Sequence, residues 1–130
     1  MLTRLLLGAA ALTLLAVPAL AADEMPAGIK TTTIGGKTVL TDAKGMTLYT
    51  YDKDANGQVT CTGKCATLWP PAVAPASAQA TGDFTLVKLA DGTQAWAYYG
   101  KPLYTWTKDT KPGDATGDGV GKVWHEAVAQ

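Results

Sequence analysis

The sequence repeats itself at a spacing of 55 residues, and this internal repeat limits the possible folds more than any other feature. Without a gap, GMTLYTYDKD at 45–54 aligns with GKPLYTWTKD at 100–109. The aligned pairs that carry the match are Tyr49 with Tyr104, Tyr51 with Trp106, Asp54 with Asp109, and Trp69 with Trp124. A repeat of this length predicts two similar structural units. We place them at about 29–73 and 84–128, joined by an Ala/Pro/Ser-rich linker at 74–83.

Each copy reads as three short strands. The runs are IKTTTI, TVLTD and MTLYTY in the first copy, and FTLVKL, QAWAYY and PLYTWT in the second. They are rich in β-branched and aromatic residues, and glycines lie at the breaks between them. We therefore predict an all-β fold, a small antiparallel sandwich or partly closed barrel built from two three-stranded repeats with pseudo-twofold symmetry. Neither copy alone has enough residues for an independent core.

The N-terminal segment has the pattern of a secretory signal. A basic residue, Arg4, precedes an apolar run from Leu5 to Val17 and the small-residue site Ala19-Leu20-Ala21. This pattern predicts a cleaved signal peptide at 1–21 and a single exported β domain at 22–130, periplasmic or secreted. Because the apolar run is shorter than the ~20 residues of a membrane-spanning helix, we expect no transmembrane anchor after cleavage.

The charge of the mature chain argues against nucleic-acid binding. Arg4 is the only arginine and leaves with the signal, so ten lysines remain against eleven acidic residues, a net charge of −1. Nucleic-acid-binding domains usually carry a basic field and arginine forks that grip phosphates. We therefore expect no nucleic-acid partner.

The repeated aromatic residues follow the two-residue period of a strand. Tyr49 and Tyr51 share one face, as do Tyr104 and Trp106. Such rings can fill the core of a small domain that has few Leu, Ile and Phe residues. Alternatively, they can form a stacking platform for a sugar or an aromatic ligand. We favour the core interpretation.

The repeated stretch resembles a known family. YTYDKD and YTWTKD both fit the motif Y-x-(F/W/Y)-x-x-D, and CTGKCATLWPP follows the first copy. In this respect the chain is similar to the bacterial secreted-repeat family of unknown function, also described as predicted lipoproteins with that motif. The resemblance implies a small exported domain built from repeats, and it names no substrate. This chain departs from the lipoprotein label because its signal lacks a lipidated cysteine.

The two cysteines, Cys61 and Cys65, are the only ones in the chain. In an exported protein an even number of cysteines predicts a disulfide, which in so short a loop stabilises by roughly 2 kcal/mol. The alternative is a redox-active thiol pair. However, the spacing is C-x-x-x-C instead of C-x-x-C, and no thioredoxin-like pattern surrounds it.

The sequence offers two candidate metal sites, although we expect no cofactor. Asp52, Asp54 and Asn56 reproduce the first half of a calcium loop, but Gly63 stands where a bidentate Glu is needed. The alternative is that these side chains cap their own backbone at the exit of the strand. The single histidine, His125, is a candidate ligand for copper.

No catalytic set is visible in the sequence. His125 has no nucleophilic partner, because the only serine, Ser77, lies in the linker. We therefore predict a non-enzymatic binding or structural module of the bacterial envelope, whose partner is an envelope protein, a glycan or a small ligand. The alternative is a metal-binding or thiol-redox accessory protein of the periplasm.

Overall fold

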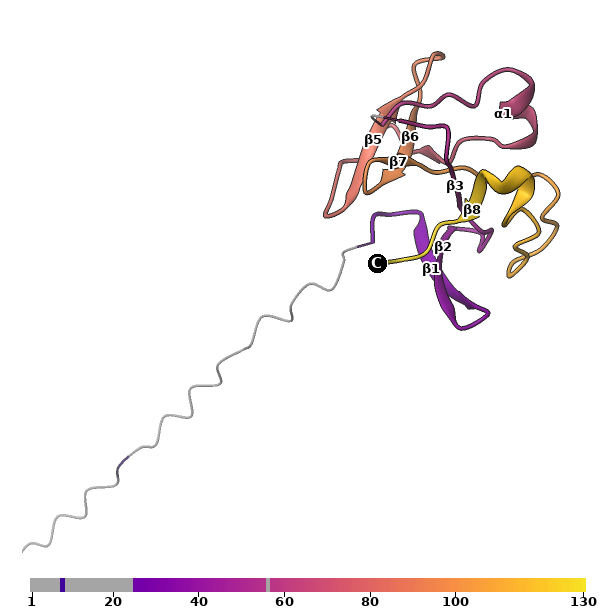
Figure 1. Cartoon of the computed structure of the whole chain (residues 1–130). Helices are drawn as coiled ribbons and strands as arrows, with labels where there is room; N and C mark the ends of the chain where they lie inside the picture. The colour runs from indigo at the N-terminus through magenta and orange to yellow at the C-terminus, as the bar shows by residue number, and fades with distance from the viewer. Residues whose placement is uncertain (1–7, 9–24, 56) are drawn as a thin grey trace, which may run out of the picture.

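Figure 1 shows the computed structural model, which describes residues 8, 25–55 and 57–130. Apart from Gly8, the predicted signal peptide at 1–21 lies outside the described residues, and so does Asn56. Within the described part of the chain, no helix has the length and apolar character needed to cross a membrane.

Short antiparallel strands supply most of the regular structure. In chain order the elements are β1 (Ile29–Ile34), β2 (Lys37–Asp42), β3 (Tyr49–Tyr51), α1 (Lys64–Leu68), β4 (Val73–Ala74), β5 (Phe84–Lys88), β6 (Gln94–Tyr98), β7 (Lys101–Pro102), the 3-10 turn η1 (Val120–Lys122) and β8 (Trp124–Glu126). Strand β1 pairs with β2, β3 pairs with β8, and β4, β5 and β7 all pair with β6. The prediction of an all-β antiparallel fold is confirmed, and the sheets do not close into a barrel.

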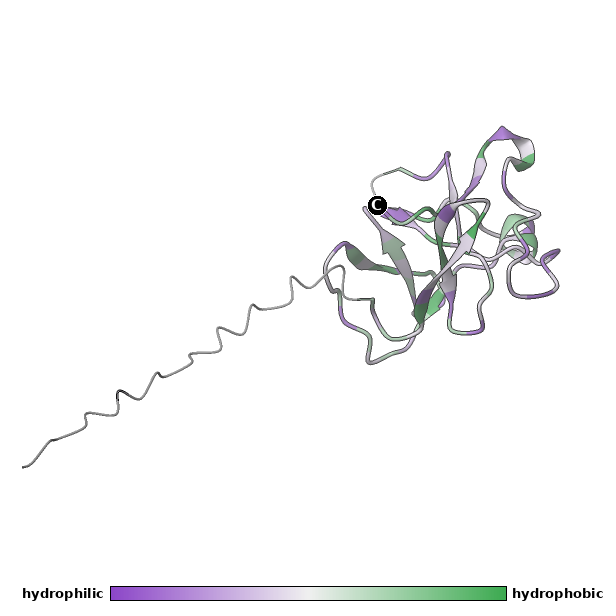
Figure 2. Cartoon of the chain, turned by 90° about the horizontal axis from the view of Figure 1, so that it is seen from below, coloured by the Kyte–Doolittle hydropathy of each residue, from purple (hydrophilic) through white to green (hydrophobic). Residues whose placement is uncertain are grey.

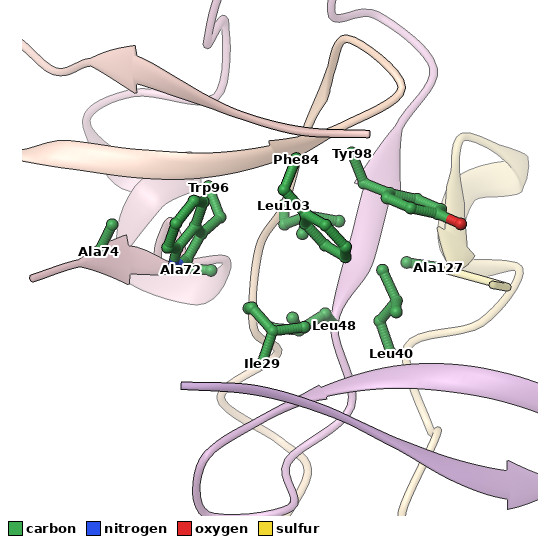
Figure 3. Packing of buried hydrophobic residues seen from close by; sticks show 10 residues of the cluster. All are labelled: Ile29, Leu40, Leu48, Ala72, Ala74, Phe84, Trp96, Tyr98, Leu103 and Ala127. Atoms are coloured by element: carbon green, nitrogen blue, oxygen red, sulfur yellow. The ribbon is translucent and has the colours of Figure 1, made fainter. Parts of the chain in front are cut away.

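The main core lies between two hairpins, one formed by β1 and β2 and the other by β5 and β6. Figure 3 shows side chains from β1 and β2 pointing toward those from β5 and β6 across a layer of buried apolar residues. Its largest members are Trp96, Tyr98 and Phe84, and Leu40, Leu48 and Leu103 are buried beside them. In Figure 2 the hydrophobic residues gather on the strands around this core, and much of the polar sequence lies in the outer loops. Two half-buried sheets thus cover each other, as in a sandwich.

Each hairpin is extended by the last residues of the other repeat, which we call its tail. Ala127, at the end of the second repeat, accepts a bond from the Leu40 amide and donates one to the Leu48 carbonyl, both at 2.8 Å. The equivalent bonds in the other half join Ala72 of the first repeat to Trp96 at 2.9 Å and to Leu103 at 2.8 Å. This exchange explains why β8 lies beside β3, although the two are far apart in sequence (Figure 1).

The expected third strand of the second repeat, PLYTWT, is not continuous. Strand β7 covers only Lys101–Pro102, and beyond it Thr105 and Thr107 donate to the carbonyls of Pro70 and Leu68. Pro70 cannot return a bond because proline has no amide hydrogen. Pro71, the next residue, is limited in the same way, so the ladder stays incomplete. In the other half, His125 and Glu126 occupy the aligned positions and form a regular strand.

The exchanged tails make a prediction about truncation. A chain that ends at Lys122 keeps the whole first repeat but loses Trp124 and Ala127, and with them the strand that pairs with β3. We expect this chain to lose cooperative thermal unfolding, because an isolated short hairpin is marginally stable at best. A chain that ends at Val128 keeps these pairings and should unfold cooperatively. Cooperative unfolding of the shorter chain would contradict the mutual dependence of the repeats.

Candidate functional site

The two motif tyrosines meet at the approximate twofold axis. The Tyr49 amide donates to the Tyr104 carbonyl at 2.8 Å, and the Tyr104 amide donates to the Tyr49 carbonyl at 2.9 Å. Residues that are equivalent in the two repeats therefore pair with each other. Both side chains are fully buried, so their hydroxyl groups must find partners inside the protein.

Each tyrosine binds the aspartate of the other repeat. The hydroxyl of Tyr49 donates to Oδ2 of Asp109, and the hydroxyl of Tyr104 donates to Oδ2 of Asp54, both at 2.6 Å. The tyrosine and the aspartate of one Y-x-(F/W/Y)-x-x-D motif thus never bind each other. Hydrogen bonds to charged groups contribute about 1.5–3 kcal/mol each, so the crossed pair ties the two repeats together.

The second oxygen of each aspartate holds the following loop. Oδ1 of Asp54 accepts bonds from the amide and hydroxyl of Thr60, at 2.8 and 2.6 Å. Oδ1 of Asp109 accepts the same two bonds from Thr116, at 2.9 and 2.6 Å. Asp54 thus caps the backbone at the exit of its strand, the alternative to a calcium ligand, and Asp109 does the same in the other repeat. The bonds across the repeats could not be read from the sequence.

Burial changes the acidity of both tyrosines. Desolvation raises the pKa of Tyr49 and of Tyr104 far above the usual value, and the hydrogen bonds to Asp109 and Asp54 raise it further. The neutral phenol is the form that donates to the carboxylate. Both hydroxyls therefore remain protonated, and both remain donors, throughout the neutral range.

Four aromatic rings form a continuous stack beside these bonds. Its order is Tyr51, Trp124, Trp69 and Trp106, with ring centroids 4.1, 3.8 and 3.9 Å apart. Successive interplanar angles are 2°, 1° and 25°. The three tryptophans are buried and Tyr51 is half-buried, so these rings form a second core. They do not form an exposed platform.

The cysteines lie at the edge of this aromatic core. Their sulfurs are 2.06 Å apart, so Cys61 and Cys65 form the predicted disulfide, and Cys61 is buried against the rings. The position aligned with Cys61 is Gly117, one residue later than the gapless alignment indicates. The Gly117 amide donates to the Tyr49 hydroxyl at 3.2 Å, and the Cys61 backbone lies against the Tyr104 hydroxyl in the equivalent place.

A groove of about 590 Å³ opens beside the disulfide. One wall is the loop that carries the cysteines, and the other is the far end of the β5–β6 hairpin. Its apolar lining includes Val59, Cys61, Ala66, Pro71, Val87 and Leu89. The groove could not be predicted from the sequence, because its walls come from different repeats.

The pseudo-twofold axis relates this groove to a site that carries an ion pair. Ile29 of β1 pairs with Asp42 of β2, and the aligned Phe84 of β5 pairs with Tyr98 of β6. Residues of β2 and β6 therefore correspond at a spacing of 56, one more than the spacing of 55 between β1 and β5. Pro71 and Thr93, which both line the groove, therefore occupy the positions of Glu126 and Lys37. The carboxylate of Glu126 and the ammonium group of Lys37 are 3.2 Å apart. The groove lies where the two halves differ.

The comparison with known protein families agrees with the motif. A family model described as a secreted repeat of unknown function matches residues 28–73 and 85–128. The chain belongs to this family. The resemblance inferred from the sequence is thereby confirmed, and the secreted-repeat motif supplies the crossed bonds and the stack described above. No curated protein and no solved structure matches the chain.

The candidate metal ligands of this secreted-repeat protein are only partly brought together. Asp52 Oδ2 and His125 Nε2 lie 2.8 Å apart on the exposed side of the β3–β8 pair. Asp54 uses both oxygens in hydrogen bonds, and Asn56 lies outside the described residues. Across the part of the chain that the structure describes, no group of three or more His, Cys, Asp or Glu side chains is arranged to hold an ion. The expectation of no cofactor, with calcium and copper as its alternatives, stays a prediction.

Replacing Tyr49 with Phe tests the crossed bonds. The variant leaves Oδ2 of Asp109 buried without its donor, and we expect the free energy of unfolding to fall by about 1.5–3 kcal/mol. The matched control is Tyr51→Phe, because the Tyr51 hydroxyl has no hydrogen-bond partner among the described residues. Denaturant unfolding should show a change of less than about 0.5 kcal/mol for this control. Equal losses in the two variants would contradict the assignment.

The raised pKa of the two motif tyrosines predicts a loss of stability in alkali. Phenols of the unfolded chain release their protons near pH 10, while Tyr49 and Tyr104 keep theirs in the folded protein. Above about pH 10 the folded state holds more protons, so the free energy of unfolding falls as the pH rises. Melting temperatures between about pH 8 and about pH 12 should show this slope, and Tyr49→Phe should make it shallower. An unchanged slope would contradict the prediction.

Proposed function

We propose that this secreted-repeat protein is a non-enzymatic binding module of the bacterial envelope, periplasmic or secreted, which binds a small apolar ligand in the groove beside the disulfide. The observation that carries the proposal is the break in symmetry. One half of the molecule places an ion pair between the tail and the hairpin, and the other half leaves an apolar hollow there.

The size and lining of the groove support a small ligand. Its volume of about 590 Å³ lies within the roughly 300–1,000 Å³ typical of ligand pockets. Val59, Val87 and Leu89 supply apolar surface on both walls, and burial of such surface is the main favourable term in binding an apolar molecule. Val73, also in the lining, is 58% exposed and offers further apolar surface to a ligand.

The walls are held in place before a ligand arrives. Cys61 is buried in the aromatic core and bonded to Cys65, so the loop on that side has little freedom. On the opposite wall, Oδ1 of Asp91 accepts bonds from the amide and hydroxyl of Thr93, at 2.9 and 2.6 Å, and closes the hairpin turn. Rigid walls lower the entropic cost of binding.

The chemistry of the lining supports binding without catalysis. Asp91 is the acidic residue of the lining, and its hydrogen bonds to Thr93 hold the pKa of the carboxyl below its usual range. It is therefore ionised at neutral pH and is a poor general acid. Among the described lining residues none is a histidine or a free thiol. The proposal requires no cofactor and no metal ion.

A test of the groove uses the protein's own symmetry. The double variant Pro71→Glu with Thr93→Lys introduces the counterpart of the Glu126–Lys37 ion pair into the groove. We expect it to weaken binding of the apolar fluorescent probe N-phenyl-1-naphthylamine about tenfold, the equivalent of about 1.4 kcal/mol. Fluorescence titration of oxidised protein measures this change.

The matched pair of variants is Val87→Glu and Thr32→Glu, since Thr32 is the residue aligned with Val87 in the other hairpin. The first should weaken probe binding and the second should leave it unchanged. Thermal unfolding verifies that every variant is folded. Equal probe binding by the wild type, the double variant and Val87→Glu would place the ligand elsewhere and overturn the proposal.

A further inference from the structure

We propose that the buried aromatic centre is a one-electron relay with two equivalent tyrosine–aspartate donors. In the first, Tyr49 gives an electron to Trp69 and its phenolic proton to Asp109. The second consists of Tyr104, Trp124 and Asp54. This function is independent of the groove, and it uses the groups that both copies of the repeat supply.

The geometry of the stack favours the loss of an electron. Trp69 and Trp124 lie parallel within 1° at a centroid distance of 3.8 Å, in close π contact. After one electron is removed, the oxidised ring is a cation that faces the electron-rich surface of its neighbour, and this contact is attractive. The close π contact thus stabilises the oxidised state of the stack.

Nearby charges place the electron hole in the middle of the stack. The ammonium group of Lys108 lies 5.6 Å from the ring centroid of Trp106, at one end. It repels a positive charge on that ring. The central rings, Trp69 and Trp124, have a π neighbour on each side. The electron hole is therefore most stable on the central pair, Trp69 and Trp124.

Each central tryptophan contacts one motif tyrosine edge-on. The centroid of Tyr49 lies 5.3 Å from that of Trp69, and the centroid of Tyr104 lies 5.1 Å from that of Trp124. An oxidised phenol is a strong acid and must release its proton to an acceptor. For Tyr49 that acceptor is Oδ2 of Asp109, 2.6 Å from the hydroxyl oxygen, in a site closed to water.

Electrons and protons balance in both steps, the oxidation of the tryptophan and its reduction by the tyrosine. An electron passes from the tryptophan to a diffusible one-electron oxidant, such as an oxygen-centred radical, and leaves a tryptophan radical cation. Tyr49 then returns an electron to Trp69 while its proton moves to the Asp109 carboxylate. The products are a neutral tyrosyl radical, a neutral tryptophan and a carboxylic acid. A small one-electron reductant of the ascorbate class, with the proton of Asp109, restores the phenol.

The oxidant reaches the relay at the half-buried end of the stack. Tyr51 is partly exposed, whereas Tyr49 and Tyr104 are fully buried. Oxidation thus begins at the surface, and the radical comes to rest on a tyrosine that solvent does not reach. Such an arrangement would let an exported protein take up radicals and hold them away from other molecules.

The test oxidises the full mature protein with photogenerated tris(bipyridine)ruthenium(III) and detects radicals by electron paramagnetic resonance after freezing. The wild type should give a tyrosyl radical. The double variant Asp54→Asn with Asp109→Asn keeps every tyrosine and tryptophan but removes both proton acceptors. We expect about a tenfold lower yield of tyrosyl radical, the effect of one pKa unit of lost driving force, and a tryptophan radical in its place.

The control is Asp114→Asn, which changes an aspartate that binds the amide and hydroxyl of a threonine and should leave the radical yield unchanged. If the double variant does not fold, each single variant retains one intact donor and should give about half the wild-type yield. A wild type that forms no tyrosyl radical would overturn the proposal. So would equal tyrosyl yields in the wild type and the folded asparagine variants.

Discussion

The structure depends on two hydrogen bonds that cross between the repeats. The hydroxyls of Tyr49 and Tyr104 are completely buried, and a buried hydroxyl without a partner costs about 1–3 kcal/mol. Each finds its acceptor only in the other copy, at Asp109 and Asp54. Neither repeat can therefore satisfy the hydroxyl of its own motif tyrosine. The exchange of the tails follows the same arrangement, since each tail completes the sheet of the opposite hairpin.

The motif of the family has a physical meaning in this arrangement. In Y-x-(F/W/Y)-x-x-D, the tyrosine supplies the crossed donor, the third residue enters the ring stack, and the aspartate accepts from the other tyrosine. The stack alternates between the repeats, as do the crossed bonds. A single motif is thus half of a site, and two copies are needed to form it.

The groove forms where the sequences of the two repeats differ. Pro71 stands where the other half has Glu126, and Cys61 stands where it has Gly117. A side chain is excluded at Gly117, because an added Cβ would lie 2.7 Å from the ring of Trp69. The first repeat accommodates Cys61 at the equivalent place, and its disulfide builds one wall of the groove.

The sequence by itself determined the repeat, the β character of its strands, the disulfide and the aromatic nature of the core. These follow from local signals: the spacing of identical residues, the two-residue period and the pairing of two cysteines. Only the tertiary structure decided that Tyr49 binds Asp109 and not Asp54, which is nearer in the sequence. It also decided that the groove forms between the tail of one repeat and the hairpin of the other. The physical reason is that identical motifs leave the choice between partners within a copy and across copies undetermined. The choice is made by the strand geometry, which directs each buried hydroxyl toward the opposite repeat.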